Sequence, residues 1–332
     1  MNAIQLQFDS FIENKRPILP PKTHPVETGR YLIATKAIDQ LCDTVTTWVD
    51  TRCPGGIIHG RPRLGKTRAI QYLINELSNE NGLLLPVCSA TCRQYRAPSE
   101  VNFFEDMLKD VGHAIVGGLA SSKRDRLSKF FIEKAEWSRT NRIVLIIDEA
   151  QRLQQIQYDW LMDIYNELDN NGISMTVVLV GQDELLHQRS VFMTLKKVQI
   201  VGRFMVHTFK FEGVKKVSDL MTCMAGYDEY SEYPETSNCS FTRYFFPDLF
   251  ENGFRLQLYA HELFEVFKEL RQENGIKKAL EIPMQYVTLT IEYCLKRYGI
   301  NGKNIDKLGK IHWREAVEHS GYIHAEMYQD IV

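Results

Sequence analysis

The chain has 332 residues, a length that accommodates one α/β domain and a smaller second domain, each with its own hydrophobic core. Its hydrophobic content of 44% is ordinary for a globular protein, and its formal charge of −2 excludes a global positive field that would attract nucleic acid. The seven cysteines show neither C-x-x-C spacing nor a metal-binding pattern, and no secretory signal or long apolar run occurs. We therefore expect a cytoplasmic protein with free thiols and no membrane contact.

Residues 1–34 are predicted to form an N-terminal extension. The four prolines between positions 17 and 25 predict an extended chain, because proline fixes its own backbone and donates no hydrogen bond. A helix is expected to open at Thr35, and with it an α/β domain that covers residues 35–212.

A phosphate-binding loop is the most specific motif of the chain. Residues 60–67 read G-R-P-R-L-G-K-T, between an apolar run at 55–59 and a helical pattern at 67–77. In this order of strand, loop and helix, the backbone N–H groups of the loop and the N-terminus of the helix can bind the negatively charged phosphates. The residues expected to contact the nucleotide are Gly60, Arg61, Pro62, Arg63, Leu64, Gly65, Lys66, Thr67 and Arg68.

The loop also predicts its own cofactors, ATP and Mg²⁺. Lys66 is expected to reach the β- and γ-phosphates, and the Thr67 hydroxyl to bind magnesium. Arg61 and Arg63 flank Pro62, so the middle of the loop is stiff and carries two positive charges. These arginines could contact the nucleotide, a neighbouring subunit or DNA. The structural alternative for the whole motif is a glycine turn before an amphipathic helix.

A second apolar strand, at residues 143–147, runs directly into Asp148 and Glu149. Five apolar residues in a row fit a central parallel strand that is buried on both faces, and ligands bind at the carboxyl ends of such strands. Asp148 is expected to hold the magnesium shell, and Glu149 to polarise the attacking water as general base. An ordinary turn at a strand end is the alternative.

A third apolar strand, at 175–180, leads into Gly181, Gln182 and Asp183. A P-loop, an apolar strand ending in DEA and this third strand together resemble the layout of AAA+ ATPases. The resemblance implies a parallel central sheet with the P-loop NTPase fold, followed by an all-helical lid at residues 213–332. It also implies ATP hydrolysis to ADP and phosphate, with magnesium.

The same resemblance assigns three further roles. Gln182 corresponds to the "sensor 1" that contacts the attacking water or the γ-phosphate, with Asp183 as the alternative. Arg203 looks like the finger that projects into a neighbouring subunit's site, which makes hydrolysis depend on oligomerisation, and Arg189 is its rival. Arg255 resembles "sensor 2", over the phosphates of its own subunit, whereas the structural alternative is a helix that starts at Asn252 as N-cap.

The branch of the AAA+ class is indicated by residues 89–108, where an Arg/Tyr-bearing loop precedes a Phe-Phe helix, together with the DEAQ run at 148–151. These features resemble the TnsC/TniB ATPases that regulate DNA transposition, over residues 35–270. The resemblance implies an ATP-dependent ring or filament of this chain on duplex DNA, which links a target-selection protein to transposase subunits. The alternative is an AAA+ adaptor outside transposition, such as a helicase loader or a secretion-associated ATPase.

DNA binding without strong sequence preference requires cationic side chains on loops that reach phosphates. The first candidates are Arg93, Tyr95 and Arg96; the second are Lys123, Arg124, Arg126 and Lys129. A solvated helix face with balanced charge is the alternative reading for both sets.

Overall fold

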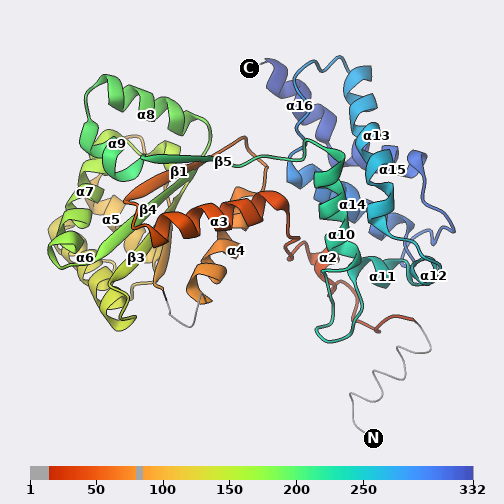
Figure 1. Ribbon diagram of the computed structural model, residues 1–332, viewed down its shortest axis with the longest axis horizontal. Coiled ribbons are helices and arrows are strands. Elements are labelled where there is room, and N and C mark those ends of the chain that lie inside the picture. Colours follow the sequence, from red (N-terminus) through yellow and green to blue (C-terminus); the bar gives the residue numbers. More distant parts are fainter. Residues whose placement is uncertain (1–14, 80–84, 332) are drawn as a thin grey trace, which may run out of the picture. The chain divides into compact units, whose positions relative to one another are not determined.

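The computed structural model describes residues 15–79 and 85–331, and the chain divides into two compact units (Figure 1). The sheet unit runs from Ile38 to Glu212. The helical unit joins the described residues up to Ala37 with those from Gly213 onward. The N-terminal segment, which we predicted as a separate extension, therefore packs within the helical unit.

Five parallel strands form the sheet of the sheet unit, in the order β2-β3-β4-β1-β5. They are β1 (Gly55–His59), β2 (Val87–Thr91), β3 (Arg142–Asp148), β4 (Ser174–Gly181) and β5 (His207–Lys210). The three central strands are buried along most of their length, as their apolar runs predict. The predicted parallel sheet is confirmed.

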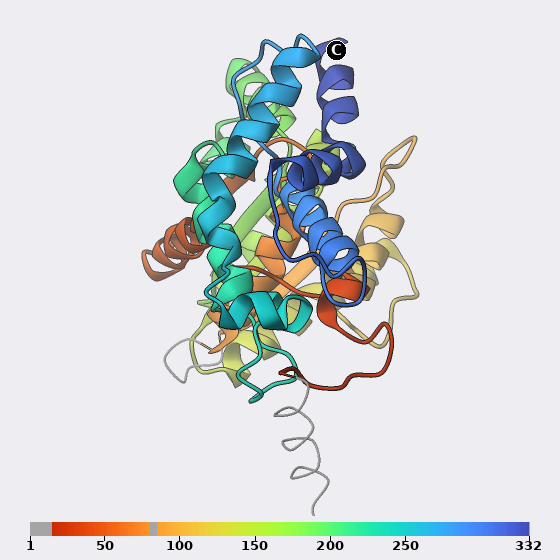
Figure 2. The ribbon, with the colours of Figure 1, turned by 90° about the vertical axis from the view of Figure 1, so that its right-hand side faces the viewer.

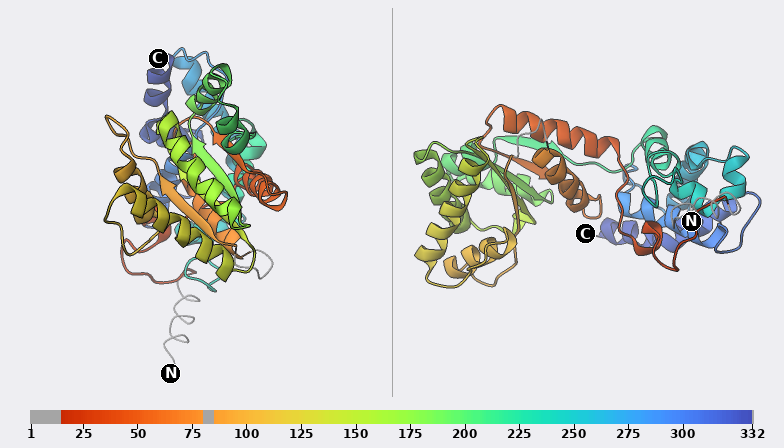
Figure 3. Two further views of the ribbon diagram at one scale, coloured as in Figure 1. Left: turned by 90° about the vertical axis from the view of Figure 1, so that its left-hand side faces the viewer. Right: turned by 90° about the horizontal axis from the view of Figure 1, so that it is seen from below.

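Helices cover both faces of this sheet (Figure 3). They are α3 (Lys36–Asp50), α4 (Lys66–Asn79), α5 (Glu100–Asp110), α6 (Ala120–Trp137), α7 (Gln155–Asn170), α8 (Glu184–Thr194) and α9 (Val198–Phe204). The connection through α4 leads from β1 to β2, toward one side edge of the sheet, whereas the later connections lead from β2 through β3 and β4 to β5, toward the other. Because crossovers between parallel strands are right-handed, α4 lies on one face and α5 to α9 on the other.

Close packing on β1 explains one glycine of the strand. A side chain at Gly56 would meet the Trp48 ring of α3 at 2.6 Å, so only a glycine lets this helix lie on the strand. Trp48 also stacks on His207 of β5, with 6.0 Å between ring centroids. One indole thus joins α3 to two neighbouring strands.

Two elements of the sheet unit have ends that apolar periodicity does not mark. Strand β2 spans Val87–Thr91, and α8 begins at Glu184. Both segments carry apolar residues beyond the ends of the element, so their periodicity does not mark the boundary.

The helical unit contains no strand within its described part and is built from short and medium helices (Figure 2). They are α2 (Pro25–Thr28), α10 (Val217–Asp228), α11 (Phe241–Phe245), α12 (Pro247–Glu251), α13 (Ala260–Glu273), α14 (Met284–Tyr298), α15 (Lys310–Ser320) and α16 (Tyr322–Ile331), with a 3-10 helix, η3 (Leu256–Tyr259). Helix α14 packs on α15, and α13 packs on both α10 and α15. The predicted all-helical region is confirmed.

The structural alternative for Arg255, a helix that starts at Asn252, is wrong: Asn252 ends α12, and α13 begins only at Ala260. Helices α15 and α16 are separate, because Gly321 adopts a left-handed conformation with φ 76°. Asp228, at the end of α10, is 2% exposed and accepts hydrogen bonds from the backbone N–H groups of Leu256 and Gln257, both at 2.9 Å.

The N-terminal segment is anchored by an aromatic cage. His24 is fully buried and stacks on Tyr244, with edge contacts to Phe241 and Phe245. Burial lowers the pKa of His24 to about 3, so the ring is neutral at physiological pH. Tyr31 donates a hydrogen bond to Glu292 at 2.9 Å inside the same unit.

None of the helices in the described part of the chain is long and apolar enough to cross a membrane.

The helical unit holds a buried ion pair whose loss we expect to be costly. Arg271, 4% exposed, donates to Glu326 at 2.5 Å and to the Tyr322 hydroxyl at 2.9 Å. Arg271→Met should lower the free energy of unfolding by about 3 kcal/mol, because it leaves the Glu326 carboxylate buried without its cation. Urea denaturation followed by circular dichroism measures the change.

The double variant Arg271→Met with Glu326→Leu is the control, because it removes both charges and keeps an apolar core. It should unfold at a higher urea concentration than Arg271→Met alone. Equal midpoints would show that the unpaired carboxylate is not the cause.

Candidate nucleotide-binding site

The predicted phosphate-binding residues meet at one edge of the sheet. Gly60 follows β1, Asp148 ends β3, and Gln182 follows β4. These three strands are neighbours in the order β3-β4-β1, and all are parallel, so their carboxyl ends lie side by side. Ligands of open α/β sheets bind at such an edge.

The loop between β1 and α4 depends on its two glycines. A side chain at Gly60 would overlap the carbonyl oxygen of Phe211, and Gly65 has a left-handed φ of 100°. Arg63 also adopts a positive φ, 67°, in the middle of the loop. The sequence therefore forms the tight turn that places Lys66 at the start of α4.

Lys66 is folded back onto its own loop. Its Nζ donates hydrogen bonds to the carbonyl oxygens of Gly60 and Arg61, each at 2.7 Å. Burial lowers the pKa of the Lys66 ammonium, while the carboxylates of Asp148 and Glu149 oppose that shift. The ammonium is thus held at the centre of the loop, next to acidic groups.

The two predicted magnesium ligands are in contact. The Thr67 hydroxyl donates to Oδ2 of Asp148 at 2.9 Å, across 81 positions of sequence. Hard oxygen donors of this kind suit Mg²⁺, which keeps several waters and takes phosphate oxygens as further ligands. In residues 15–79 and 85–331, no group of three His, Cys, Asp or Glu side chains is arranged to hold a metal by itself. A hydroxyl and a carboxylate in contact are oxygen donors of the kind that Mg²⁺ takes from proteins, and their role as its ligands stays a prediction.

Glu149 is held by neighbours that the sequence prediction did not include. It adopts a left-handed backbone with φ 55° at the start of the 3-10 helix η2 (Ala150–Arg152). Its Oε2 accepts a hydrogen bond from Gln151 Nε2 at 2.9 Å and forms an ion pair with an Arg152 guanidinium nitrogen at 3.0 Å. Gln151 and Arg152 were visible in the sequence only as the residues after the acidic pair, and no local pattern marks such a contact.

The two candidates for sensor 1 make different contacts. Gln182 donates its backbone N–H to Oε1 of Gln151 at 3.3 Å. The carboxylate of Asp183 lies 2.6 Å from Nδ1 of His59, which is 6% exposed at the end of β1. Gln182 thus connects to the neighbours of Glu149, whereas Asp183 is engaged with β1.

The predicted arginines lie on other elements. Arg203, on α9, stacks over the Tyr165 ring at 4.5 Å, and its rival Arg189 lies on α8. Arg255 belongs to the helical unit, where it lies 3.5 Å from the centre of the Phe250 ring and donates to the Phe250 carbonyl oxygen. The roles of Arg203, Arg189 and Arg255 toward the nucleotide stay predictions.

Most of the predicted DNA-binding side chains are engaged inside the sheet unit. Arg93 pairs with Asp110 at 2.7 Å, Tyr95 donates to Asp106 at 2.5 Å, and Arg124 pairs with Asp163 at 2.8 Å. Arg126 donates to two loop carbonyls, those of Ile115 and Gly117. Arg96 is exposed and has no side-chain partner in the described part of the chain.

Lys123 contradicts the expectation that it offers a charge to DNA. Its side chain is 2% exposed, and its Nζ lies 2.5 Å from Oε2 of Glu105, which joins α6 to α5. Together with Lys109, this contact lowers the pKa of Glu105 to about 2. The lysine is a buried part of the helix packing, because its stem lies between the two helices and its charge is paired.

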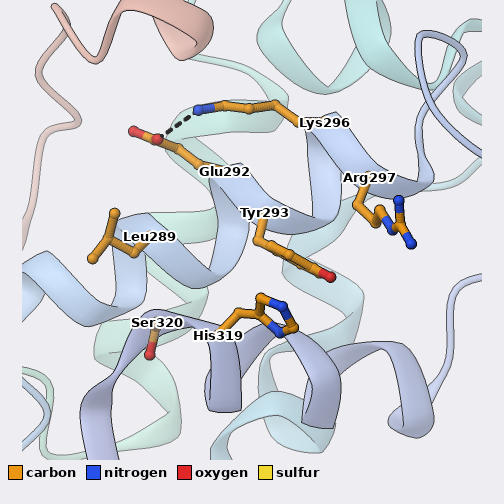
Figure 4. Close-up of a pocket in the computed structure, with 7 residues that line it drawn as sticks. All are labelled: Leu289, Glu292, Tyr293, Lys296, Arg297, His319 and Ser320. Atoms are coloured by element: carbon orange, nitrogen blue, oxygen red, sulfur yellow. Dashed lines mark hydrogen bonds and ion pairs between the residues drawn. The ribbon is translucent and has the colours of Figure 1, made fainter.

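A shallow pocket of about 420 Å³ lies in the helical unit between α14 and α15 (Figure 4). Its lining residues are Leu289, Glu292, Tyr293, Lys296, Arg297, His319 and Ser320. Lys296 is paired with Glu292 at 2.9 Å, and Tyr293 donates to Glu315 at 2.6 Å. None of the predicted nucleotide or DNA ligands lines this pocket.

Comparison with known proteins supports the assignment of the sheet unit. A family model described as an AAA domain (AAA_22) matches residues 49–188. The Aeropyrum pernix ORC2 protein, solved in ADPNP-ADP complexes, aligns with a TM-score of 0.55 at 15% identity, over 91% of this chain and 69% of that chain. The A. pernix ORC1 protein in complex with DNA aligns with a TM-score of 0.51 at 12% identity, over 86% of this chain and 66% of that chain. No curated protein matches the sequence.

Three independent observations agree on the class of this domain. The family match covers the P-loop and the acidic pair, and the strand order β2-β3-β4-β1-β5 brings both motifs to one edge of the sheet. The similarity to the two archaeal structures extends this agreement to the fold. Residues 49–188 match an AAA domain, and the chain has an AAA+ P-loop NTPase fold with a helical C-terminal region.

Proposed function

We propose that the protein is a magnesium-dependent ATPase. The observation that carries this proposal is the contact of Thr67 with Asp148 beside the half-buried Lys66 ammonium. A cation that is held by its own loop carbonyls can transfer those hydrogen bonds to phosphate oxygens. The hydroxyl and the carboxylate would then share one metal ion with the β- and γ-phosphates.

Hydrolysis follows from the same arrangement. Glu149 accepts a proton from water as the water oxygen bonds to the γ-phosphorus and the bond to the β-phosphate oxygen breaks. Lys66 would stabilise charge on the transferring group, and a metal ion held by Thr67 and Asp148 would supply further positive charge there. Gln182, Arg255 and, from a neighbouring subunit, Arg203 would add further contacts to it.

We further propose that ATP controls binding to duplex DNA, in a ring or filament of this chain that regulates DNA transposition. The resemblance of residues 35–270 to TnsC/TniB ATPases supports this role. The fold that is shared with A. pernix ORC1, solved in complex with DNA, agrees with a nucleotide-dependent DNA protein. Transposase subunits and a target-selection protein are the partners in this proposal.

An AAA+ adaptor outside transposition, such as a helicase loader, is the second candidate. The similarity to A. pernix ORC2 and ORC1 favours it over a secretion-associated ATPase. Transposase genes beside the coding gene would favour the first role, and helicase or replication genes the second. Binding to duplex DNA that ATP does not stimulate, measured by fluorescence polarisation, would exclude both.

Lys66→Ala should strongly weaken ATP binding. Removing one charge-assisted contact to phosphate costs about 3 kcal/mol, so the affinity for ATP should fall roughly a hundredfold. Titration with a fluorescent ATP analogue measures the loss. Lys129→Ala is the matched control, because this lysine is exposed on α6 and pairs with Asp125 of the same helix. Equal affinities in the two variants would remove Lys66 from the site.

Glu149→Gln should retain ATP and lose turnover. A glutamine keeps the size of the side chain and its place beside Gln151, but it accepts no proton from water. Phosphate release should fall about a hundredfold or more, with the affinity for ATP nearly unchanged. Hydrolysis at the wild-type rate would exclude Glu149 as the general base.

Arg96→Gln should weaken DNA binding equally for all sequences. One lost phosphate contact reduces the slope of log affinity against log salt by about one unit. Arg139→Gln is the control, because Arg139 is also exposed but precedes β3 at the opposite edge of the sheet. Identical slopes for the wild type and Arg96→Gln would exclude Arg96 as a phosphate contact.

A further inference from the structure

The amide of Gln151 bridges two neighbouring strand ends. Its Nε2 donates to Oε2 of Glu149 at 2.9 Å, and its Oε1 accepts the backbone N–H of Gln182 at 3.3 Å. Only this orientation of the amide satisfies both partners, since the carboxylate accepts and the N–H donates. The side chain therefore ties the acidic pair after β3 to the end of β4.

The backbone of Gln151 is itself held in place by hydrogen bonds from α8. Gln188, on α8, donates to the carbonyl oxygens of Gln151 and Leu153 at 2.8 and 3.1 Å, and it accepts from the Tyr158 hydroxyl at 3.2 Å. Tyr158 is fully buried in the core of the sheet unit. The backbone of Gln151 is thus attached to the packed interior, and its amide has little freedom to turn away from Glu149.

The end of β4 provides space for this amide. A Cβ at Gly181 would overlap Oε1 of Gln151 and would lie 2.8 Å from a methyl group of Leu185. The backbone conformation at Gly181 does not itself require a glycine, because its φ lies outside the left-handed region. The glycine is required here by the close approach of the Gln151 side chain.

Gln151 and Arg152 both contact the same carboxylate oxygen of Glu149. Oε2 accepts the hydrogen bond from Gln151 and forms the ion pair with Arg152, whereas Oε1 has no partner in the described part of the chain. The Arg152 contact is weaker, since both of its charges are more than a third exposed to solvent. Gln151 is half-buried and held from behind, so its hydrogen bond sets the orientation of the carboxylate.

We propose that Gln151 is a positioning residue for hydrolysis, which holds Oε2 of Glu149 and leaves Oε1 to take the proton of the attacking water. Gly181 serves this role by keeping the space that the amide occupies. The inference rests on the proposed ATPase activity. It also means that the position of the β4 end helps to set the orientation of the Glu149 carboxylate, because the backbone N–H of Gln182 holds the Gln151 amide.

The test is a double-mutant cycle on the full chain with ATP, magnesium and duplex DNA. Gln151→Met keeps the length of the side chain and removes both hydrogen bonds. Gly181→Ala displaces the amide, and the atoms that its methyl group meets are the ends of flexible side chains, so we expect it to fold. Gln155→Met, in the first turn of α7, is the control, because Gln155 makes no side-chain hydrogen bond in the described residues.

Gln151→Met should lower kcat at least about tenfold, because a misplaced base slows proton transfer, and should change KM for ATP by less than about twofold. Gly181→Ala should lower kcat similarly, and the double variant should be no slower than the slower single variant. Gln155→Met should match the wild type. Thermal unfolding shows that each variant is folded.

Several outcomes would overturn the proposal. If Gln151→Met hydrolyses ATP at the wild-type rate, or if it raises KM and leaves kcat unchanged, Gln151 does not position the base. If the effects of the two substitutions multiply, Gly181 acts independently of Gln151. A wild-type protein that binds ATP without turnover would instead refute the proposed ATPase, and the role of Gln151 would fall with it.

Discussion

The site depends on one interaction, the hydrogen bond between the Thr67 hydroxyl and the Asp148 carboxylate. It joins the first turn of α4 to the end of β3, two segments that are far apart in the sequence. The contact exists because β3, β4 and β1 are parallel neighbours, so that the chain leaves all of them at the same edge. Neither residue alone would provide a metal site.

The turn after β3 fixes the position of the Glu149 side chain. Glu149 takes a left-handed backbone conformation, and the chain then turns through a single 3-10 helix. This turn brings Gln151 and Arg152 back beside the carboxylate that precedes them. Strain at such a position persists only where the surroundings hold it, and here Gln188 and the buried Tyr158 do so.

The cationic side chains illustrate the difference between charge in a sequence and charge on a surface. Arg93 and Arg124 are paired with carboxylates, and Lys123 is buried against Glu105. A chain with nearly balanced charge can neutralise most of its cations internally, so basic residues near a loop predict DNA binding poorly. Arg96 differs because it follows β2 and stays exposed without a carboxylate partner in the described residues.

The sequence by itself determined the local elements of the site: the loop at 60–67, the apolar strand before Asp148 and the helical character beyond residue 213. These follow from glycine spacing and apolar periodicity, which act over a few neighbouring residues. Only the tertiary structure decided that Gln151 reaches both Glu149 and Gln182, that Lys123 is buried, and that the N-terminal segment packs in the helical unit. Such contacts depend on which strands become neighbours, and local patterns carry no information about that choice.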